Sequence, residues 1–237
     1  MDPLPDTPVA LLTGASRGLG RALATALNRH GWRLVIDGRD AARLAATGAA
    51  LPDPRLVTAL PGDVADPAHR AALTAAVGDR LDLLVNNASD LGPSPLPHLA
   101  DLRPEDLERV LAVNVVAPLA LTRSVLPALR RAGGRVLNVS SDAAVEAYEG
   151  WGGYGASKAA LDQLTAVLAV EHPELRIYAV DPGDMATDMQ QAAFPGEDVS
   201  DRPAPETVVP SLLALVTGDR PSGRYRAAEL IIARAAR

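Results

Sequence analysis

Tyr154 and Lys158 are the two residues of this 237-residue chain whose types and spacing point most directly to chemistry. At a spacing of four, both side chains lie on one face of a helix. A phenol is a poor acid–base catalyst near neutral pH, but a neighbouring ammonium favours the phenolate and lowers the pKa of the phenol. Lys158 is the only lysine in a chain that otherwise uses arginine. A compact ammonium can also bind ribose hydroxyls, which arginine does less readily. The pair therefore predicts proton transfer beside a bound nucleotide.

Three further polar residues could complete such a site. Ser141 ends a predicted strand thirteen residues before the tyrosine, so its hydroxyl could polarise a substrate carbonyl at the carboxyl edge of a sheet. Ser140 is the neighbour that could be mistaken for it. Asn114 lies in an apolar helical stretch and is either a satisfied core amide or the anchor of a water that leads to Lys158. Tyr148 has glycine four residues later, which makes it the weaker acid candidate.

A glycine-rich turn, Thr13–Gly20 (TGASRGLG), lies between the first predicted strand and the first predicted helix. Glycines permit a tight turn and allow backbone N–H groups to approach a pyrophosphate at the helix N-terminus, where the helix dipole favours anions. The alternative is an ordinary strand-to-helix turn. The position of the glycine-rich turn between a strand and a helix nevertheless predicts a dinucleotide site.

The end of the second predicted strand indicates which dinucleotide would bind. Gly38 stands where an NAD-selecting acid is expected, Arg39 follows it, and Arg17 lies inside the turn on the same side. Two guanidiniums that converge on one ribose would suit a 2′-phosphate, so NADP(H) is expected. Asp37 keeps NAD open, because a small shift in register would make it the NAD-type acid; otherwise it is a strand residue turned away from the ribose. Asp63 either meets the adenine edge or caps the next helix.

The elements that must position these residues alternate along the chain. Short apolar runs predict strands buried on both faces, and amphipathic stretches predict helices between them, a pattern typical of a parallel sheet with helices on both sides. Predicted strands cover residues 8–13, 32–37, 55–60, 81–85, 135–139, 176–180 and 229–232. Predicted helices cover residues 18–30, 104–131, 154–171 and 206–217, with another that opens near Asp66, whereas residues 184–205 have no clear period.

Composition excludes several classes of protein. Hydrophobic residues make up 48% of the chain and charged residues 22%, so it can bury a core and is not globally disordered. We find no continuous run of about 18 apolar residues and expect no membrane span. The absence of cysteine excludes disulfides and thiolate metal sites, and the four scattered histidines give no metal-ligand spacing. A net charge of −6 argues against nucleic-acid binding. The acidic, proline-rich start is unlike a secretory leader, so a cytoplasmic protein is expected.

Together these motifs resemble the short-chain dehydrogenase/reductase family over nearly the whole chain. The resemblance rests on Thr13–Gly20, Asp63-Val64, Asn86–Ala88, Asn114, Ser141, Tyr154–Lys158 (YGASK), Asp181–Gly183 and Thr187. It implies an α/β, three-layer doubly wound Rossmann fold with a seven-stranded parallel sheet. Residues 1–237 would form a single domain with a short substrate lid near 184–205, assembled as a homodimer or homotetramer.

The resemblance also implies roles for individual residues. Tyr154 would be the acid–base, Ser141 would orient the carbonyl or alcohol, Lys158 would bind ribose and lower the tyrosine pKa, and Asn114 would hold a proton-relay water. Pro182, Gly183 and Thr187 would close over the nicotinamide. The expected cofactor-binding residues are Gly14, Ser16, Arg17, Gly18, Leu19, Gly20, Arg39, Asp63, Val64, Asn87, Ala88, Tyr154, Lys158, Pro182, Gly183 and Thr187.

The expected function is NADP(H)-dependent interconversion of a ketone or aldehyde and an alcohol. Alternatives that use the same tetrad are NAD-dependent alcohol oxidation, imine reduction and epimerisation. A catalytically silent nucleotide sensor is a further alternative, although such a protein should tolerate loss of the tyrosine or lysine. The residues expected to line the substrate pocket are Leu91, Val145, Trp151, Met185, Met189 and Phe194, which suit an apolar or ring-bearing substrate or simply pack the lid. The acids nearby, which could bind an amine or face solvent, are Asp90, Asp142, Glu146 and Asp184.

Overall fold

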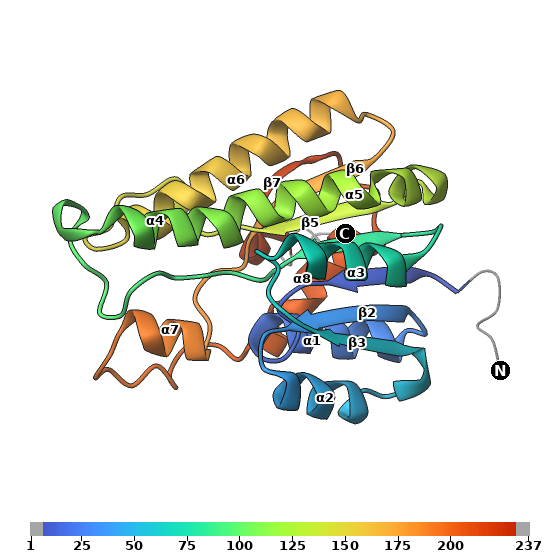
Figure 1. Ribbon diagram of the computed structural model, residues 1–237, viewed down its shortest axis with the longest axis horizontal. Coiled ribbons are helices and arrows are strands. Elements are labelled where there is room, and N and C mark those ends of the chain that lie inside the picture. Colours follow the sequence, from blue (N-terminus) through green and yellow to red (C-terminus); the bar gives the residue numbers. More distant parts are fainter. Residues whose placement is uncertain (1–6, 231–237) are drawn as a thin grey trace.

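One parallel sheet of seven strands runs through the computed structural model, which describes residues 7–230 (Figure 1). The strands are β1 (Val9–Leu12), β2 (Arg33–Gly38), β3 (Val57–Pro61), β4 (Leu83–Asn86), β5 (Arg135–Val139), β6 (Arg176–Asp181) and β7 (Gly223–Arg226). Their order is β3-β2-β1-β4-β5-β6-β7, and every neighbouring pair is parallel. The order changes direction between β1 and β4, the point at which ligands bind beyond the carboxyl ends of such sheets.

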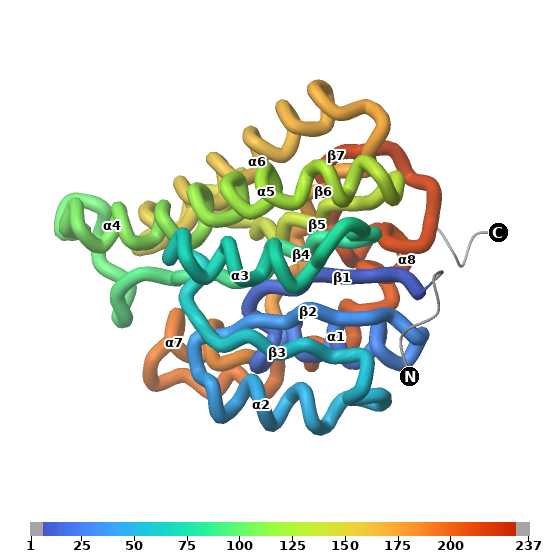
Figure 2. Tube along the Cα trace, turned by 45° about the vertical axis from the view of Figure 1, so that its right-hand side comes forward, coloured from blue at the N-terminus to red at the C-terminus, as the bar shows by residue number. Residues whose placement is uncertain are grey.

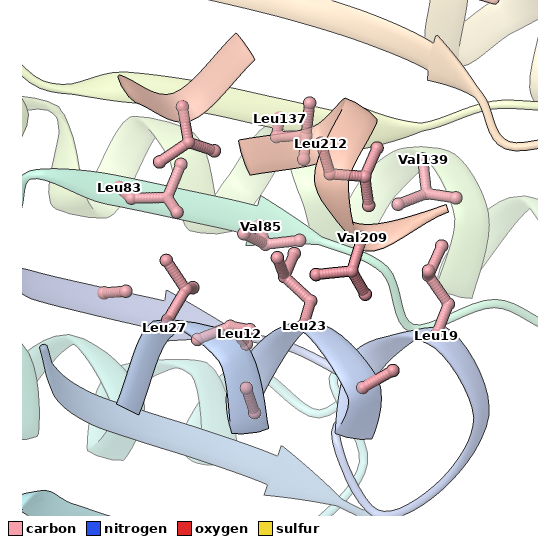
Figure 3. Close-up of a cluster of buried hydrophobic side chains, with 14 of the residues drawn as sticks. Leu12, Leu19, Leu23, Leu27, Leu83, Val85, Leu137, Val139, Val209 and Leu212 are labelled. Carbon is pink, nitrogen blue, oxygen red and sulfur yellow. The ribbon is translucent and has the colours of Figure 1, made fainter. Parts of the chain in front are cut away.

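Helices cover both faces of this sheet (Figures 1 and 2). One layer holds α1 (Gly18–Arg29), α2 (Ala41–Ala50) and α8 (Val209–Thr217); the other holds α3 (Pro67–Val77), α4 (Pro104–Leu111), α5 (Ala117–Ala132) and α6 (Gly152–Glu171). Because successive strand residues point to opposite faces, Leu12 packs in the core beneath α1 and α8, whereas Leu11 packs beneath α3 and α5. Figure 3 shows the first of these clusters, in which Leu23 and Leu27 of α1 meet Val209 and Leu212 of α8. The three-layer, doubly wound α/β fold predicted from the sequence is confirmed.

The helix predicted at residues 104–131 is interrupted by a π-helical turn, Ala112–Val116, between α4 and α5. Asn114 lies in this turn, and residue 118, four positions later, is a proline without an N–H. The Asn114 carbonyl therefore lacks the donor that an α-helix would supply, which explains why the helix widens here. By length and composition the whole segment could cross a membrane, but Leu121 and Leu129 face the core of the sheet.

The strand predicted at residues 229–232 is wrong. The seventh strand is β7, Gly223–Arg226, and Glu229 and Leu230 continue a helical turn that follows it; residues 231 and 232 lie outside the described residues. The apolar run after residue 229 looked like a buried strand, yet Leu230 enters the core from a helix. β7 is an edge strand with the sequence GRYR, only partly buried, so it gives no apolar signal.

The strand ends bring the predicted site residues together. Gly14 follows β1, Asn87 follows β4, Ser141 follows β5, and Asp181 ends β6. In a parallel sheet all these positions lie at one edge. A short helix, α7 (Asp188–Ala193), follows β6, and both views place it beyond this end of the sheet (Figures 1 and 2).

Candidate active site

A cavity of about 830 Å³ opens at the carboxyl edge of the sheet. It is lined from the glycine turn after β1, through the ends of β2, β4, β5 and β6, to the start of α6 and to α7. All the catalytic and cofactor-binding residues predicted from the sequence line it, except Gly20 and Asn114. One continuous space therefore joins the proposed dinucleotide turn to the Tyr154–Lys158 pair.

The glycine turn is packed too closely for side chains. Gly14 has φ +66°, and a Cβ there would lie 2.8 Å from the Cα of Ala88. The Asn87 side chain ties β4 to the turn by donating to the Thr13 carbonyl at 2.9 Å and to the Gly14 carbonyl at 3.0 Å. Gly20 lies behind the turn, where a Cβ would approach the Gly14 oxygen to 2.4 Å. Gly20 thus permits α1 to pack against the turn and does not face the cavity.

The Asp37 carboxylate supports the glycine turn by a hydrogen bond to Gly14. Its Oδ1 accepts the Gly14 N–H at 2.6 Å, and its Oδ2 lies 3.1 Å from His69 Nε2. The residue is buried, and this burial raises the pKa of Asp37 above its ordinary value. Both carboxylate oxygens already have protein partners, which favours the interpretation of Asp37 as a structural strand residue. The contribution of His69 was not predicted, because it depends on α3 packing beside β2.

The N-terminus of α1 fits a phosphate. Arg17 occupies the N-cap position, and within the described residues no side chain caps this end of the helix. The first turn carries no acidic residue, so the positive end of the helix dipole faces the cavity uncompensated. Gly18 has φ +54°, and Thr187 from the start of α7 lies against it. These features would hold the pyrophosphate of a nicotinamide dinucleotide.

Arg17 and Arg39 do not converge as predicted. Arg17 instead pairs with Asp188 on α7, and Arg43 Nη1 lies 3.1 Å from the same carboxylate. Arg39 Nη1 lies 3.9 Å from the Asp90 carboxylate. All three arginines line the cavity. Arg43 was not predicted, because its contact with Asp188 joins residues 145 positions apart in the sequence. Two guanidiniums that already share one carboxylate can reach a single anion together.

Lys158 is buried beside Tyr154. Its Nζ donates to the Val139 carbonyl of β5 at 2.8 Å and lies 5.4 Å from the centre of the Tyr154 ring. Only 2% of Lys158 is exposed, so its ammonium is almost wholly removed from water. Burial lowers the pKa of Lys158 to about 8, and the nearby charge of Asp162 partly opposes that change.

Tyr154 keeps its proton in this arrangement. Burial raises the pKa of Tyr154 to about 12, and the charge of Asp142 adds to the rise, while hydrogen bonds from Ser89 and Ser141 lower it. The sequence-based expectation that Lys158 lowers this pKa is not met, because its Nζ turns to a backbone carbonyl and desolvation dominates. Tyr154 is therefore a protonated phenol across the ordinary pH range. Ser89 was not predicted, although it directly follows the Asn-Asn-Ala motif.

Ser141 lies at the base of the cavity, next to an acid. Its Oγ donates to Asp142 Oδ1 at 2.9 Å and accepts the Ala143 N–H at 3.2 Å. The neighbouring Ser140 also lines the cavity, but its hydroxyl oxygen is buried and has no hydrogen-bond partner within residues 7–230. The Tyr148 hydroxyl lies within hydrogen-bond distance of Glu146 Oε2 and Asp142 Oδ2, and these carboxylates raise the pKa of the Tyr148 phenol.

The Asn114 side chain is a satisfied core amide. Its Nδ2 donates to the Asp90 carbonyl at 2.8 Å and to Ser157 Oγ at 2.9 Å. Its Oδ1 accepts from the Asp90 N–H at 2.7 Å and from Ser89 Oγ at 3.2 Å. The amide thereby joins the loop that carries Ser89 to α6. A relay water, if bound here, would use the main-chain carbonyl that Pro118 leaves without a donor.

The far end of the cavity is aromatic and acidic. Trp151 packs edge-on against Tyr154 with ring centres 5.6 Å apart, and lies 6.0 Å from Phe194. Two predicted lining residues do not line it: Leu91 is buried in the cluster around Tyr154, and Val145 is 61% exposed. The predicted lining residues that do face it are Trp151, Met185, Met189 and Phe194. Of the predicted acids, Asp142 and Asp184 line it, whereas Asp90 and Glu146 pair with Arg109 and Arg226.

Two residues serve local turns while they line the cavity. Asp63 accepts the Ala65 N–H at 2.9 Å in the turn before α3, whereas the residue that caps α3 is Asp66. Thr187 caps α7 by accepting the Gln190 N–H at 3.2 Å. Each retains a position on the cavity wall from which it could contact a cofactor.

Residues 8–198 match the family model described as short chain dehydrogenase. The chain belongs to the short-chain dehydrogenase/reductase family. It is 37% identical over 202 residues to the sepiapterin reductase of Mus musculus, which covers 78% of this chain and 77% of that one. A ketoacyl reductase assigned to the granaticin polyketide synthase of Streptomyces violaceoruber is 37% identical over 79% of this chain and 76% of its own. A Shigella flexneri protein solved in complex with NADP superposes with a TM-score of 0.86 at 30% identity, over 96% of this chain and 99% of that one.

The buried ammonium of this short-chain dehydrogenase should reduce its stability. Because burial lowers the pKa of Lys158 from 10.5 to about 8, the unfolded chain binds this proton more tightly. The penalty is complete below about pH 8 and disappears above about pH 10.5. We expect Lys158→Met to raise the free energy of unfolding at pH 7 by about 1–3 kcal/mol. It should also flatten the rise in stability between pH 8 and 10.5, measured by urea unfolding.

Arg130→Met provides the control, because Arg130 is a half-exposed cation on α5. This variant should leave the pH dependence between 8 and 10.5 unchanged. A Lys158→Met protein that is no more stable than wild type at pH 7, with the same alkaline slope, would contradict a desolvated ammonium.

Proposed function

We propose that this protein is an NADPH-dependent reductase that converts a ketone or aldehyde to an alcohol. The observation that carries the proposal is the protonated, buried Tyr154 phenol, which shares one cavity with the glycine turn and Lys158. When bound, the reduced nicotinamide supplies hydride to the carbonyl carbon. The chain's own residues would then bind the substrate, orient its oxygen and supply a proton.

The pKa values of the site favour the reducing direction. Tyr154 would donate its proton to the substrate oxygen as negative charge develops there, and its raised pKa keeps that proton available across the ordinary pH range. Ser141 would orient the same oxygen by its hydroxyl. Lys158, cationic below about pH 8, would bind the ribose hydroxyls.

We propose NADP(H) over NAD(H) as the cofactor. Arg17, Arg39 and Arg43 line the cavity beside the end of β2, where a 2′-phosphate would lie in a Rossmann-type site. The similar Shigella flexneri protein was solved with NADP. Asp37, the acid that could have favoured NAD, uses its carboxylate to hold Gly14 and His69.

Loss of the Tyr154 hydroxyl tests the assigned chemistry. Tyr154→Phe should lower kcat for NADPH oxidation with a panel of ketones by about 10²–10⁴-fold, because general acid catalysis contributes about that much. The dissociation constant for NADPH, measured by fluorescence titration, should change less than about threefold. Tyr148→Phe is the matched control: it removes a second phenol on the cavity wall, whose proton is bound to carboxylates, and should keep most of the activity. Equal losses in both variants would refute the assignment, and turnover by neither variant nor wild type would favour a nucleotide sensor.

Removal of the Asp188 carboxylate, which pairs with Arg17 and Arg43, tests the cofactor preference. Asp188→Asn releases Arg17 and Arg43 from a competing anion, so NADPH should bind roughly 3–10-fold more tightly while NADH changes little. Arg43→Ala should weaken NADPH binding by about 10–100-fold, as expected for a charged hydrogen bond of about 1.5–3 kcal/mol. Asp184→Asn is the control, because Asp184 lines the cavity but pairs with Gln190. Tighter binding of NADH than of NADPH to wild type would show the assignment to be wrong.

A further inference from the structure

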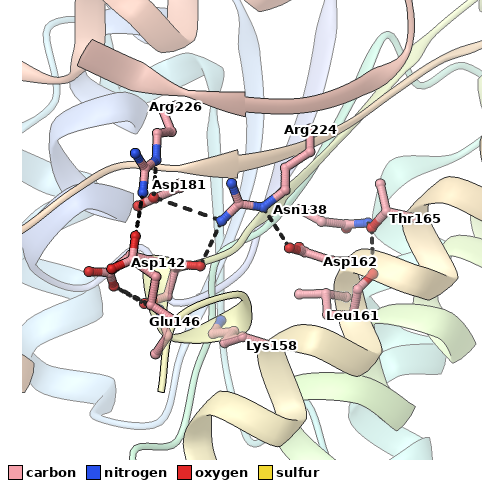
Figure 4. A network of polar contacts seen from close by, with 12 residues as sticks. Asn138, Asp142, Glu146, Lys158, Leu161, Asp162, Thr165, Asp181, Arg224 and Arg226 are labelled. Atoms are coloured by element: carbon pink, nitrogen blue, oxygen red, sulfur yellow. Dashed lines mark hydrogen bonds and ion pairs between the residues drawn. The ribbon is translucent and has the colours of Figure 1, made fainter. Parts of the chain in front are cut away.

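Arg224 of the edge strand β7 reaches over the carboxyl end of β6 into the region behind the proposed active site (Figure 4). Its Nη2 donates to the main-chain carbonyl of Ser141 at 2.9 Å, and its Nε donates to Asp162 Oδ2 at 2.8 Å. The same Nη2 lies 3.8 Å from Asp181 Oδ2. One guanidinium thus contacts the segment after β5, the helix α6 and the end of β6.

These three partners share one property: each belongs to a segment that carries proposed site residues. Ser141 is itself the proposed orienting hydroxyl. Asp162 lies one helical turn after Lys158 on α6, and Asp181 directly precedes the Pro182-Gly183 loop. The side chain of Arg224 is 28% exposed, that of Asp162 15% and that of Asp181 6%. Partial removal from water strengthens these charge-assisted bonds relative to a surface pair.

Resting on the proposed reductase function, we propose that the Arg224–Asp162 pair is a positioning device that fixes Ser141 relative to Tyr154 and Lys158. Neither side chain contacts substrate in this role. Arg224 holds the Ser141 backbone, Asp162 anchors the guanidinium to α6, and the distance between the two catalytic segments is thereby fixed. A misplacement of about 1 Å between such groups can cost about 10²-fold in rate.

The chemistry of the pair requires arginine. The guanidinium is planar and presents Nε and Nη2 in fixed directions, which here point to two different segments. A lysine ammonium could bind one of these partners but could not hold both in one plane. The neighbouring Arg226 takes a different role, because it binds Glu146 at 2.8 Å and lies 3.7 Å from the Asp181 carboxylate.

Asp162 adds an electrostatic effect on Lys158. Its charge favours the buried ammonium, and its Oδ1 has no hydrogen-bond partner in the described part of the chain. The groups around Lys158 are the Val139 carbonyl of β5 and the Tyr154 ring on α6. Asp142 after β5 and Asp181 of β6 act on Tyr154, and Arg224 of β7 pairs with Asp162. Removal of the Asp162 charge should therefore lower the pH above which the ammonium is lost.

Kinetics of three arginine variants test the positioning role. Arg224→Gln and Arg224→Lys should each lower kcat about 10–100-fold, while the dissociation constant for NADPH stays within about twofold of wild type. Arg135→Gln is the matched control: Arg135 also lies on the sheet and donates to a backbone carbonyl, that of Gly218, at the opposite, amino end. It should keep kcat within about twofold even where its melting temperature falls as much as that of the Arg224 variants. Full activity of Arg224→Lys, or an equal kcat loss in Arg135→Gln, would overturn the proposal.

A pH profile separates positioning from simple destabilisation. In Asp162→Asn the alkaline fall of kcat/KM should move to lower pH than in wild type, because Lys158 then loses its proton more easily. The Arg135→Gln profile should coincide with that of wild type. An alkaline limb unchanged in Asp162→Asn would show that the pair does not act on Lys158 and would overturn that half of the proposal.

Hydrogen exchange, measured on the proteins without substrate, tests whether Arg224 holds the segment after β5 in place. Backbone amides of residues 141–146 should exchange faster in Arg224→Gln than in wild type and Arg135→Gln. If wild type oxidises no NADPH with any carbonyl compound, the proposed reductase function fails, yet this comparison still tests the positioning role. If wild type is active but exchange and kcat are both unchanged in Arg224→Gln, the positioning role fails and the reductase function stands.

Discussion

The burial of one ammonium beside one phenol is the constraint on which the rest of this structure depends. An isolated buried cation is costly, so the chain must supply a hydrogen-bond acceptor and a compensating charge at fixed positions. The Val139 carbonyl at the end of β5 and Asp162 on α6 do so. Both depend on the register of α6 against β5 and β6, and that register depends on the two layers of helices that cover the sheet. Burial of Lys158 thus lowers the free energy of unfolding, and it creates a site in which proton transfer takes place away from water.

The sequence predicted the features that arise from local pattern. Apolar runs located six strands, and the glycine spacing located the turn after β1, because strand burial and close backbone approach each demand particular residue types in consecutive positions. The position of Tyr154, Lys158 and Ser141 at one sheet edge followed from the parallel topology. What local pattern could not supply was pairing between distant segments. Arg43 meets Asp188 across 145 residues, and Arg224 meets Ser141 across 83, contacts that only the folded chain defines.

The misplaced final strand illustrates this limit. An edge strand pairs with one neighbouring strand only and is less buried than a central strand, so β7 can carry two arginines. Its polar sequence, GRYR, resembles that of a loop. Only the pairing of β7 with β6 brings the guanidiniums of Arg224 and Arg226 beside the site. The π turn at Asn114 is a second example, since the spacing from Asn114 to Pro118 was present in the sequence. Its consequence, an Asn114 side chain bound to Ser157 and Asp90, requires the packed structure.

The arginines and the aromatic rings that line the cavity lie at different ends, and this arrangement would orient a dinucleotide. Arg17, Arg39 and Arg43 lie on the β2 side, together with the positive N-terminus of α1. The acids on the β5–β6 side are Asp142, Asp181 and Asp184, where Lys158 is the cation on the cavity wall among the described residues. A phosphate-bearing adenosine end would bind in the first region, where the phosphate would replace Asp188 as the partner of Arg17 and Arg43. The aromatic-lined space beside Trp151 then remains for the reactive ring and the substrate carbonyl, next to the phenol that holds the transferable proton.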